Sequence, residues 1–489
     1  MTIVSSAGKA QVPAQGCTRA RSPAELRRKA LYLLLLVIAS GVILNGLANQ
    51  IWFRYLRPPL AADLQTGVLD QEASLRSIRI FITARQGEDS LRTMYPAIQL
   101  LTVDRRAPIY RTIFFTNHIK FQYSPASLLP YYVLTRWGAS YDALLRISRF
   151  CTWGSVWGVL FLTVVIVLRV SGIDPWNVTN WRSNAWLVFA VALAALFFDP
   201  LIFAFDLGQI QTLLTLGFTA AFYCWMTGRE KTAGALIGVM VLVKPQYALF
   251  LVWALLRKKY GAAASCAVCF ATGMLVSCIV FGWHNNIAYL AVLKVIGSTG
   301  ETFAANQSMN GLLNRLLFNG DNVRWHDLQY PPFNPLVYAG TLISAVILLG
   351  TALFHRWEQR RGRVADFAAI LLASTAASPI AWDHHYAILT PILAWMWFGD
   401  YAWRGRRRDT VLFALAYMLT ANYFLPALAL ASVPVANILE SYMYFGALLV
   451  FILLLNAQVE APPQPAPAMP EAASADGGKP GTSLPKWAV

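Results

Sequence analysis

Charged residues are scarce in this sequence: Asp, Glu, Lys and Arg make up 13% of its 489 residues, whereas hydrophobic residues make up 57%. The mean hydropathy is positive, at +0.48. No soluble core of ordinary size needs so much leucine, valine, alanine and phenylalanine. The composition therefore excludes an ordinary soluble enzyme and predicts a polytopic membrane protein.

The signatures of several enzyme classes are also missing. The sequence has no glycine-rich phosphate loop of the Walker or Rossmann type, no Gly-x-Ser-x-Gly elbow and no Cys/His spacing of a metal site. Cys266 and Cys269 have the spacing of a redox motif, but they lie in one apolar run without a second pair, so we expect them to serve packing. No cofactor and no metal are expected.

The net charge of +16 could indicate a nucleic-acid partner, but the basic residues fall in short clusters between apolar runs. Clusters of this kind mark the cytoplasmic loops of membrane proteins. We therefore exclude nucleic acid. The same pattern predicts an all-α integral membrane bundle of about twelve transmembrane helices, in a bacterial-type inner membrane. The expected spans are 31–51, 145–168, 185–205, 210–226, 233–243, 247–256, 262–281, 335–354, 366–377, 387–398, 411–431 and 437–455.

Because cytoplasmic and extracytoplasmic loops alternate along the chain, each segment outside these spans can be assigned to one side of the membrane. We expect a cytoplasmic N-terminal segment (1–30), a membrane domain (31–456) and a disordered cytoplasmic tail (457–489) that is rich in Pro, Ala and Gly. Two large loops, 52–142 and 284–333, are expected outside the cytoplasm. The short fifth and sixth spans could also be one helix kinked by Pro245, but that would break the charge pattern. No convincing internal repeat is present, which weakens a transporter built from inverted halves.

The most unusual stretch runs from Ser378 to Tyr386 and contains Trp382, Asp383, His384 and His385 between two apolar runs. In hydrocarbon, each unpaired polar group costs several kcal/mol. The stretch is therefore expected at a membrane boundary or along a wet cavity. The simpler alternative is an ordinary polar loop between spans.

Other unusual polar residues fall on the same, extracytoplasmic side of the predicted topology. They are Glu88 and Asp89, the turn of Asp206 and Gln209, Lys244, and Asn306, Gln307 and Ser308 with Arg315. Taken singly, Lys244 could snorkel to the interface, Asp206 could cap a helix and Asn306 could lie in a solvated loop. Together they predict one polar cavity.

This mixture of side chains suits one kind of chemistry. A carboxylate can act as a general base on a hydroxyl group, and Lys, Arg and His can bind a phosphate and stabilise it as it leaves. Aromatic side chains such as Tyr95, Tyr123 and Trp382 suit sugar faces. Outside the cytoplasm there is no ready supply of nucleotides, so a lipid-linked phosphate is the expected donor.

A series of motifs now resembles a known family. In chain order they are the first-loop acid, Tyr95-Pro96-Ala97-Ile98-Gln99-Leu100-Leu101, Pro108-Ile109-Tyr110, Phe121-Gln122-Tyr123-Ser124-Pro125, Leu207-Gly208-Gln209, Val243-Lys244-Pro245-Gln246, Asn306-Gln307-Ser308 with Arg315, and Ser378-Pro379-x-x-Trp382-x-His384-His385. Over roughly residues 30–455 the chain resembles glycosyltransferase family 87, membrane enzymes of the GT-C superfamily that use polyprenyl-phosphate sugars, typically mannose.

The resemblance implies an inverting transfer in which a first-loop acid deprotonates the acceptor hydroxyl and polyprenyl phosphate leaves. It implies Asp89 as the base, with Glu88 as the alternative and Asp104 as a remote third candidate. Asp89 lies farther from Tyr95 than the family pattern has it. The other implied site residues are His384, His385, Lys244, Arg315 and Lys120 at the phosphate, and Tyr95, Tyr123, Gln209, Asn306, Gln307, Trp382 and Asp383 at the substrates.

The expected partners are membrane lipids, a polyprenyl-phosphate donor and a lipid or glycan acceptor. Mannose is the expected sugar, although arabinofuranose would suit the same polar groups. The main rival is a transporter or flippase for sugars or lipid-linked saccharides, which predicts polar residues near the midplane of several spans. An inactive assembly partner is a third alternative. The sequence carries no signal for the oligomeric state.

Overall fold

The computed structural model describes residues 23–51, 79–84, 86–326, 329–355, 363–399, 407–424 and 433–456. The predictions for residues 1–22, for 52–78 of the first loop and for the tail 457–489 lie outside these ranges. All regular secondary structure in the described ranges is helical, and Asn306 and Trp382 form an isolated β-bridge. The predicted all-α fold is confirmed.

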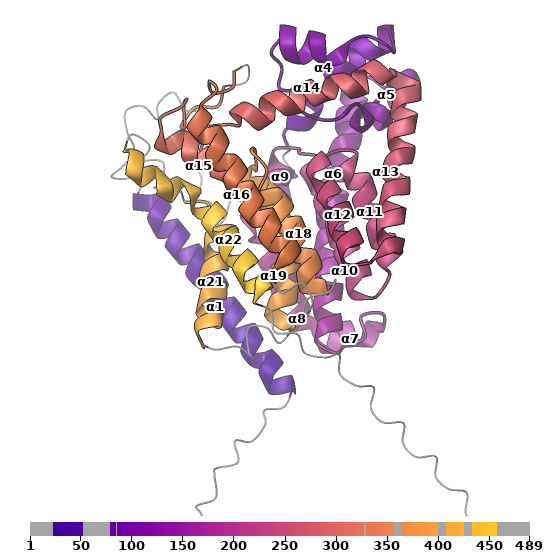
Figure 1. Ribbon diagram of the computed structural model, residues 1–489. Helices are drawn as coiled ribbons and strands as arrows, with labels where there is room; N and C mark the ends of the chain where they lie inside the picture. Colours follow the sequence, from indigo (N-terminus) through magenta and orange to yellow (C-terminus); the bar gives the residue numbers. More distant parts are fainter. Residues whose placement is uncertain are drawn as a thin grey trace, which may run out of the picture. The chain divides into compact units, whose positions relative to one another are not determined.

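The helices follow one another with short connections (Figure 1). In chain order they are α1 (Pro23–Ile51), α4 (Asp89–Val103), η3 (Tyr110–Thr116), η4 (Pro125–Leu128), α5 (Leu129–Arg136), α6 (Tyr141–Val170), α7 (Val178–Ser183), α8 (Ala185–Leu196), α9 (Asp199–Asp206), α10 (Gln211–Met226), α11 (Glu230–Val241), η5 (Pro245–Ala248), α12 (Leu249–Leu256), α13 (Tyr260–Phe281), α14 (Trp283–Thr299), α15 (Met309–Leu316), α16 (Pro335–Phe354), α18 (Val364–Ala376), η6 (Asp383–Ile388), α19 (Leu389–Phe398), α21 (Arg407–Ala421), η8 (Pro434–Ser441) and α22 (Tyr442–Leu455).

Five of the described helices are long and apolar enough to cross a membrane, and α8 with α9 makes a sixth span if the pair, bent by 59°, counts as one. The chain is thus a multi-pass membrane protein, but the predicted number of about twelve spans is not confirmed. Each predicted range does contain helix. Several of these helices are too short, because 12 residues of α11 at 1.5 Å each cover about 18 Å of a core about 30 Å thick.

The two large loops of the predicted topology are partly helical. The first loop contains α4, η3, η4 and α5, and the second contains α14 and α15. Side chains of the first loop, among them Ile98, Tyr110 and Phe121, form a buried apolar cluster with Tyr289 and Val292 of α14. The two loops therefore build one cap. In Figure 1 this cap lies at the end of the bundle opposite to α7 and the start of α1.

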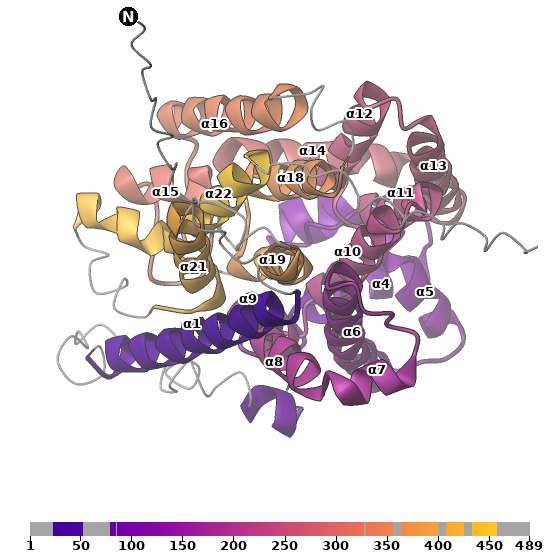
Figure 2. The same cartoon turned by 90° about the horizontal axis from the view of Figure 1, so that it is seen from below.

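The centre of the bundle is occupied by α19 (Figure 2). Most of its side chains are buried, as expected for a helix that is apolar all round. It packs against α6 and α1, and the Trp397 indole donates a hydrogen bond to the Ala30 carbonyl over 2.9 Å. Because η6 leads directly into α19, the two histidines stand where this central helix begins.

Small residues bring α11 and α13 together. A Cβ atom on Gly234 would lie 2.2 Å from the Ala262 carbonyl oxygen, and one on Gly238 would lie 2.5 Å from that of Cys266. Glycines four residues apart allow this close packing of membrane helices. Cys266 is buried, and both it and Cys269 are free thiols, in agreement with the predicted packing role.

A buried ion pair ties α12 to α18. The Arg257 guanidinium donates to both Asp366 carboxylate oxygens, over 2.6 and 3.2 Å, and both side chains are fully buried. Removing one partner of such a pair leaves an uncompensated charge, which costs about 3 to 5 kcal/mol. We expect Asp366→Ala to lower the unfolding temperature strongly in detergent. Glu230→Ala, which opens the half-exposed pair with Lys259, is the control and should change stability by about 1 kcal/mol or less. Equal losses would contradict a stabilising role for the buried pair.

Candidate active site

A cavity of about 960 Å³ lies between the cap and the bundle. It is large enough for a small ligand with several polar groups. Its walls come from α4, the segment 119–123, the turn between α9 and α10, residues 243–249, α14 and the segment 374–385. Nine of the predicted site residues line it: Asp89, Lys120, Tyr123, Gln209, Lys244, Trp382, Asp383, His384 and His385. The other five, Glu88, Tyr95, Asn306, Gln307 and Arg315, lie outside the lining.

Two glycines place Asp89 at the cavity. Gly87 donates a backbone hydrogen bond to Asp206 over 2.6 Å, and Asp89 donates one to Leu207 over 3.0 Å. Gly208 has a φ of +68°, and a Cβ atom on it would lie 2.5 Å from the Gly87 carbonyl oxygen. Only glycine fits this approach. The contact fixes the start of α4 against the turn that carries Gln209.

The Gly208 contact leads to a prediction about activity. Gly208→Ala should displace Asp89, and because misplacing a catalytic group by about 1 Å can cost about 100-fold, we expect a loss of activity of that order. Gly138→Ala is the matched control, because Gly138 also has a positive φ (+91°) but no atom lies within 4 Å of the place that its new methyl group would take. The measurement is the rate of the transfer reaction proposed below, in purified protein. Equal rates in the two variants would show that the close approach does not position the acid.

Asp89 is the centre of a hydrogen-bond network. The Gln209 amide donates to the Asp89 carboxylate. The Gln209 oxygen accepts from Ser90 over 2.9 Å and from Tyr123 over 3.1 Å. Burial raises the pKa of Tyr123, so its hydroxyl stays protonated and can donate. Gln209, which is predicted to orient substrate, lines the cavity and also holds the Asp89 carboxylate.

Glu88 and Tyr95 lie on the other side of the same segment. Glu88 accepts a hydrogen bond from the Tyr141 hydroxyl over 2.9 Å, and the Tyr95 ring stands edge-on to the Tyr141 ring at 4.7 Å. Both residues thus contact α6. The reason is helix geometry, since successive residues point about 100° apart and Asp89 already faces the cavity.

Lys244 and His385 meet on the wall formed by the bundle. The Lys244 ammonium donates to Gln211 over 2.7 Å and lies 2.5 Å from Nε2 of His385. Burial lowers the pKa of Lys244, and burial together with Lys244 lowers the pKa of His385. A neutral imidazole that accepts at Nε2 carries its proton on Nδ1. Among the described residues this buried Nδ1 has no hydrogen-bond partner, so a ligand can use it.

His384 is held by its neighbour. The Asp383 carboxylate accepts from the His384 backbone over 2.7 Å and lies 3.2 Å from its Nδ1. His384 Nε2 and the second Asp383 oxygen are buried and have no partner within the described part of the chain. Both residues line the cavity. They add polar atoms that a bound substrate could satisfy.

Asn306 and Gln307 hold the histidine segment in place. The Asn306 amide donates to the Pro379 carbonyl over 3.1 Å and accepts from Ala381 over 3.0 Å. Gln307 donates through its backbone to Ala381 over 2.8 Å, while its side chain bonds to backbone groups elsewhere. These bonds use the amides that were predicted to orient substrate, so the structure assigns both residues to the scaffold.

Arg315 is also part of the scaffold. It is buried, donates to Ser441 over 2.6 Å and to three backbone carbonyls over 3.1 to 3.3 Å, and lies 3.4 Å from the Glu440 carboxylate. Its donors are therefore directed at neighbouring elements and away from the cavity. The predicted contact of Arg315 with a phosphate does not fit this placement.

Lys120 lines the cavity but is paired. Its ammonium donates to Glu301 over 2.7 Å and lies over the rings of Trp325 and Tyr330, at 3.9 and 4.6 Å from their centroids. The Trp325 ring also stands edge-on to Trp382 at 5.2 Å. This wall offers aromatic surface with a neutralised cation, which suits a sugar better than a phosphate.

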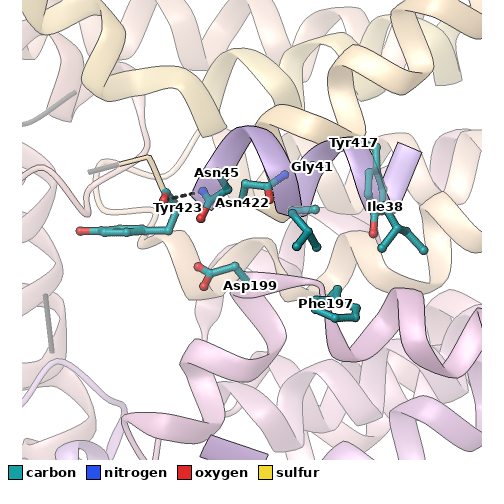
Figure 3. Close-up of a pocket in the computed structure, with 10 residues that line it drawn as sticks. Ile38, Gly41, Asn45, Phe197, Asp199, Tyr417, Asn422 and Tyr423 are labelled. Carbon is teal, nitrogen blue, oxygen red and sulfur yellow. Dashed lines mark hydrogen bonds between the residues drawn. The ribbon is translucent and has the colours of Figure 1, made fainter. Parts of the chain in front are cut away.

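A much smaller cavity, of about 20 Å³, lies beside α1 (Figure 3). Asn45 donates across it to the Tyr423 carbonyl over 2.7 Å, and Asp199 and Asn422 also line it. The space is sufficient for about one water molecule and too small for a sugar. We therefore assign it to the packing of α1. Within the described ranges, no group of three His, Cys, Asp or Glu side chains is placed to hold a metal ion.

The fold and the site define a class: an integral membrane protein in which a cap of two loops encloses a polar cavity with an acid on one wall and a lysine and two histidines on another. The model of glycosyltransferase family 87 matches residues 121–381. This is more than half of the chain, and the protein belongs to that family. The matched range includes Tyr123, Gln209 and Lys244, and it leaves out Asp89 and His385.

Curated relatives agree with this assignment. The chain is 32% identical over 203 residues to a polyprenol-phosphate-mannose-dependent α-(1-2)-phosphatidylinositol pentamannoside mannosyltransferase of Mycobacterium tuberculosis, covering 41% of this chain and 43% of the relative. It is 27% identical over 276 residues to an α-(1-2)-phosphatidylinositol mannoside mannosyltransferase of the same species with the same donor, covering 53% and 60%. The aligned part thus spans about half the length of these relatives. No solved structure matches the chain.

Proposed function

We propose that this protein transfers a sugar, most simply mannose, from a polyprenyl-phosphate donor to a hydroxyl group of a lipid or glycan acceptor, with inversion at the anomeric carbon and on the extracytoplasmic face of the membrane. The observation that carries the proposal is the placement of Asp89 and of Lys244 with His385 on different walls of one cavity. Such a cavity separates a proton acceptor from a phosphate site.

The arrangement accounts for each step of the transfer. The Asp89 carboxylate removes the proton from the acceptor hydroxyl, whose oxygen forms a bond to the anomeric carbon. The bond from that carbon to the phosphate oxygen breaks on the opposite face, and the electron pair leaves with polyprenyl phosphate. Lys244 stabilises the negative charge on the leaving phosphate, and His385 can donate to it through Nδ1.

The charges of the buried basic residues support Lys244 as the phosphate ligand. The described ranges contain four buried lysine and arginine side chains. Three of them face a carboxylate: Lys120 faces Glu301, Arg257 faces Asp366 and Arg315 faces Glu440. Lys244 instead contacts an amide and an imidazole. A buried cation without an anion favours a site for an anionic ligand.

The loops at each end of the bundle support the proposed side of the membrane. In Figure 1 the cap lies at the end of the bundle opposite to α7. Arg182 lies in the last turn of α7, and Arg169 lies in the last turn of α6, just before it. Because arginine is enriched in short cytoplasmic loops, the end with α7 is assigned to the cytoplasm. A donor on the other side is most readily supplied as a lipid-linked sugar, as the names of the relatives also indicate.

The test is a transfer assay with purified protein in lipid or detergent. Radiolabelled polyprenyl-phosphate mannose, polyprenyl-phosphate arabinose and a nucleotide mannose are each offered with extracted membrane lipids as acceptor. We expect label in a lipid or glycan product from polyprenyl-phosphate mannose and none from the nucleotide sugar. Transfer from the nucleotide sugar, or binding of both lipid-linked donors without transfer, would overturn the proposal. The anomeric configuration of the product tests the inversion.

A further inference from the structure

Gln211 is a buried polar residue for which the reaction described above has no role. It is the first residue of α10, its side chain is completely buried, and its oxygen accepts the hydrogen bond from Lys244 over 2.7 Å. The Gln211 amide nitrogen donates to the Thr215 hydroxyl of the same helix over 3.4 Å. Gln211 thus connects Lys244 to α10, and both the oxygen and the nitrogen of its amide group are hydrogen-bonded.

The chemical nature of Gln211 matters because of the charge beside it. At Lys120, Arg257 and Arg315 the neighbouring side chain is a carboxylate, so each pair is close to neutral. An amide can accept the same hydrogen bond without contributing a negative charge. The imidazole of His385 likewise contributes none. When Lys244 is protonated, the pair of Gln211 and Lys244 therefore carries one net positive charge at the cavity wall.

We infer that Gln211 is a positioning residue that holds the Lys244 ammonium toward the cavity without neutralising it, and so keeps this wall selective for a ligand with a phosphate group. The inference deepens the proposed function and rests on its assignment of a lipid-linked phosphate to Lys244. Gln211 acts through Lys244 and needs no contact with the substrate.

Two substitutions at position 211 separate this role from simple packing. Gln211→Glu keeps the shape but puts a carboxylate against Lys244, whereas Gln211→Met removes the hydrogen bond and leaves the charge of Lys244 intact. Binding of farnesyl phosphate and of farnesol is measured in detergent for each purified protein. We expect Gln211→Glu to weaken farnesyl-phosphate binding by about 10- to 100-fold, and Gln211→Met by only a few-fold. Farnesol binding should be the same in all three proteins.

The pH dependence provides a second readout. Phosphate binding to wild type should fall as the pH rises through the pKa of Lys244, which burial lowers. A carboxylate at position 211 favours the charged lysine, so in Gln211→Glu the remaining binding should fall at higher pH than in wild type. If Gln211 served packing alone, the pH at which phosphate binding falls would be the same in both proteins. Gln246→Glu, which adds a charge to the same cavity wall, is the control for a general effect of charge.

The outcomes are distinct. Equal losses in Gln211→Glu and Gln211→Met, or in Gln211→Glu and Gln246→Glu, would overturn the role of Gln211. If wild type binds farnesyl phosphate no better than farnesol, the phosphate site and the inference both fail. If Gln211→Glu selectively loses farnesyl phosphate but wild type transfers sugar from neither lipid-linked donor, the inference stands and the proposed reaction is wrong.

Discussion

Asp89→Asn is expected to lower the rate of sugar transfer by about 100- to 10,000-fold, the range typical for the loss of a general base. Asparagine has nearly the shape of aspartate, and its oxygen can still accept the hydrogen bond from Gln209. The variant should therefore fold and bind the donor normally while it lacks the group that removes the acceptor proton. Single-turnover kinetics with polyprenyl-phosphate mannose measure the effect, and donor binding should be unchanged.

Glu88→Gln is the matched control for this prediction. It makes the same chemical change one residue earlier, and glutamine can still accept the hydrogen bond from Tyr141. We expect its transfer rate to remain within a few-fold of wild type. An active Asp89→Asn protein together with an inactive Glu88→Gln protein would reverse the assignment of the base.

Lys244→Met is expected to lower kcat/KM for the donor by about 100-fold or more. Losing one partner of a buried, hydrogen-bonded charge interaction costs about 2 to 5 kcal/mol. Of the buried lysine and arginine side chains among the described residues, Lys244 is the one without a carboxylate beside it. Methionine keeps most of the side-chain volume. The effect should appear in donor binding as well as in transfer, because the phosphate is present in both the bound donor and the leaving group.

The exposed Lys258 supplies the control for Lys244, since Lys258→Met removes the same charge from the surface. The transfer rate of the Lys258→Met protein should equal that of wild type. The pH profile of kcat/KM tests whether the charged form of Lys244 is the active one. Wild-type activity should decline on the alkaline side as Lys244 loses its proton. The decline should occur below the usual pKa of a lysine, because burial lowers the pKa of Lys244. Normal donor binding by a folded Lys244→Met protein would remove the lysine from the phosphate site.

The sequence is sufficient to predict where helices occur and which polar stretches approach one another. Apolar runs locate the helices, and a buried lysine or a pair of histidines is conspicuous in an apolar background. The same information could not predict the number of spans. Whether α8 and α9 form one span depends on the bend near Phe198, and the depth of short helices such as α11 depends on their neighbours, which no local pattern specifies.

Individual side-chain roles are harder to predict, because the direction of a side chain is set by tertiary contacts. Glu88 and Asp89 are equivalent in sequence, but the backbone contact with Leu207 turns Asp89 to the cavity. Arg315 looks like a phosphate ligand until Glu440 and Ser441 are found beside it. Gln211 is inconspicuous, because a single glutamine at the start of an apolar helix resembles an ordinary helix terminus; its burial is visible only in the structure.

The contact between Gly87 and Gly208 has a consequence for sorting related genes. Each glycine faces the backbone of the other segment so closely that a side chain on either would push the acid away from the cavity. Natural selection for catalysis should therefore act on both positions together, although they are distant in the chain. A homologue that carries a larger residue at one of them is expected to have lost its first-loop acid as well, and this pairing would distinguish degenerate copies from working enzymes in genome surveys.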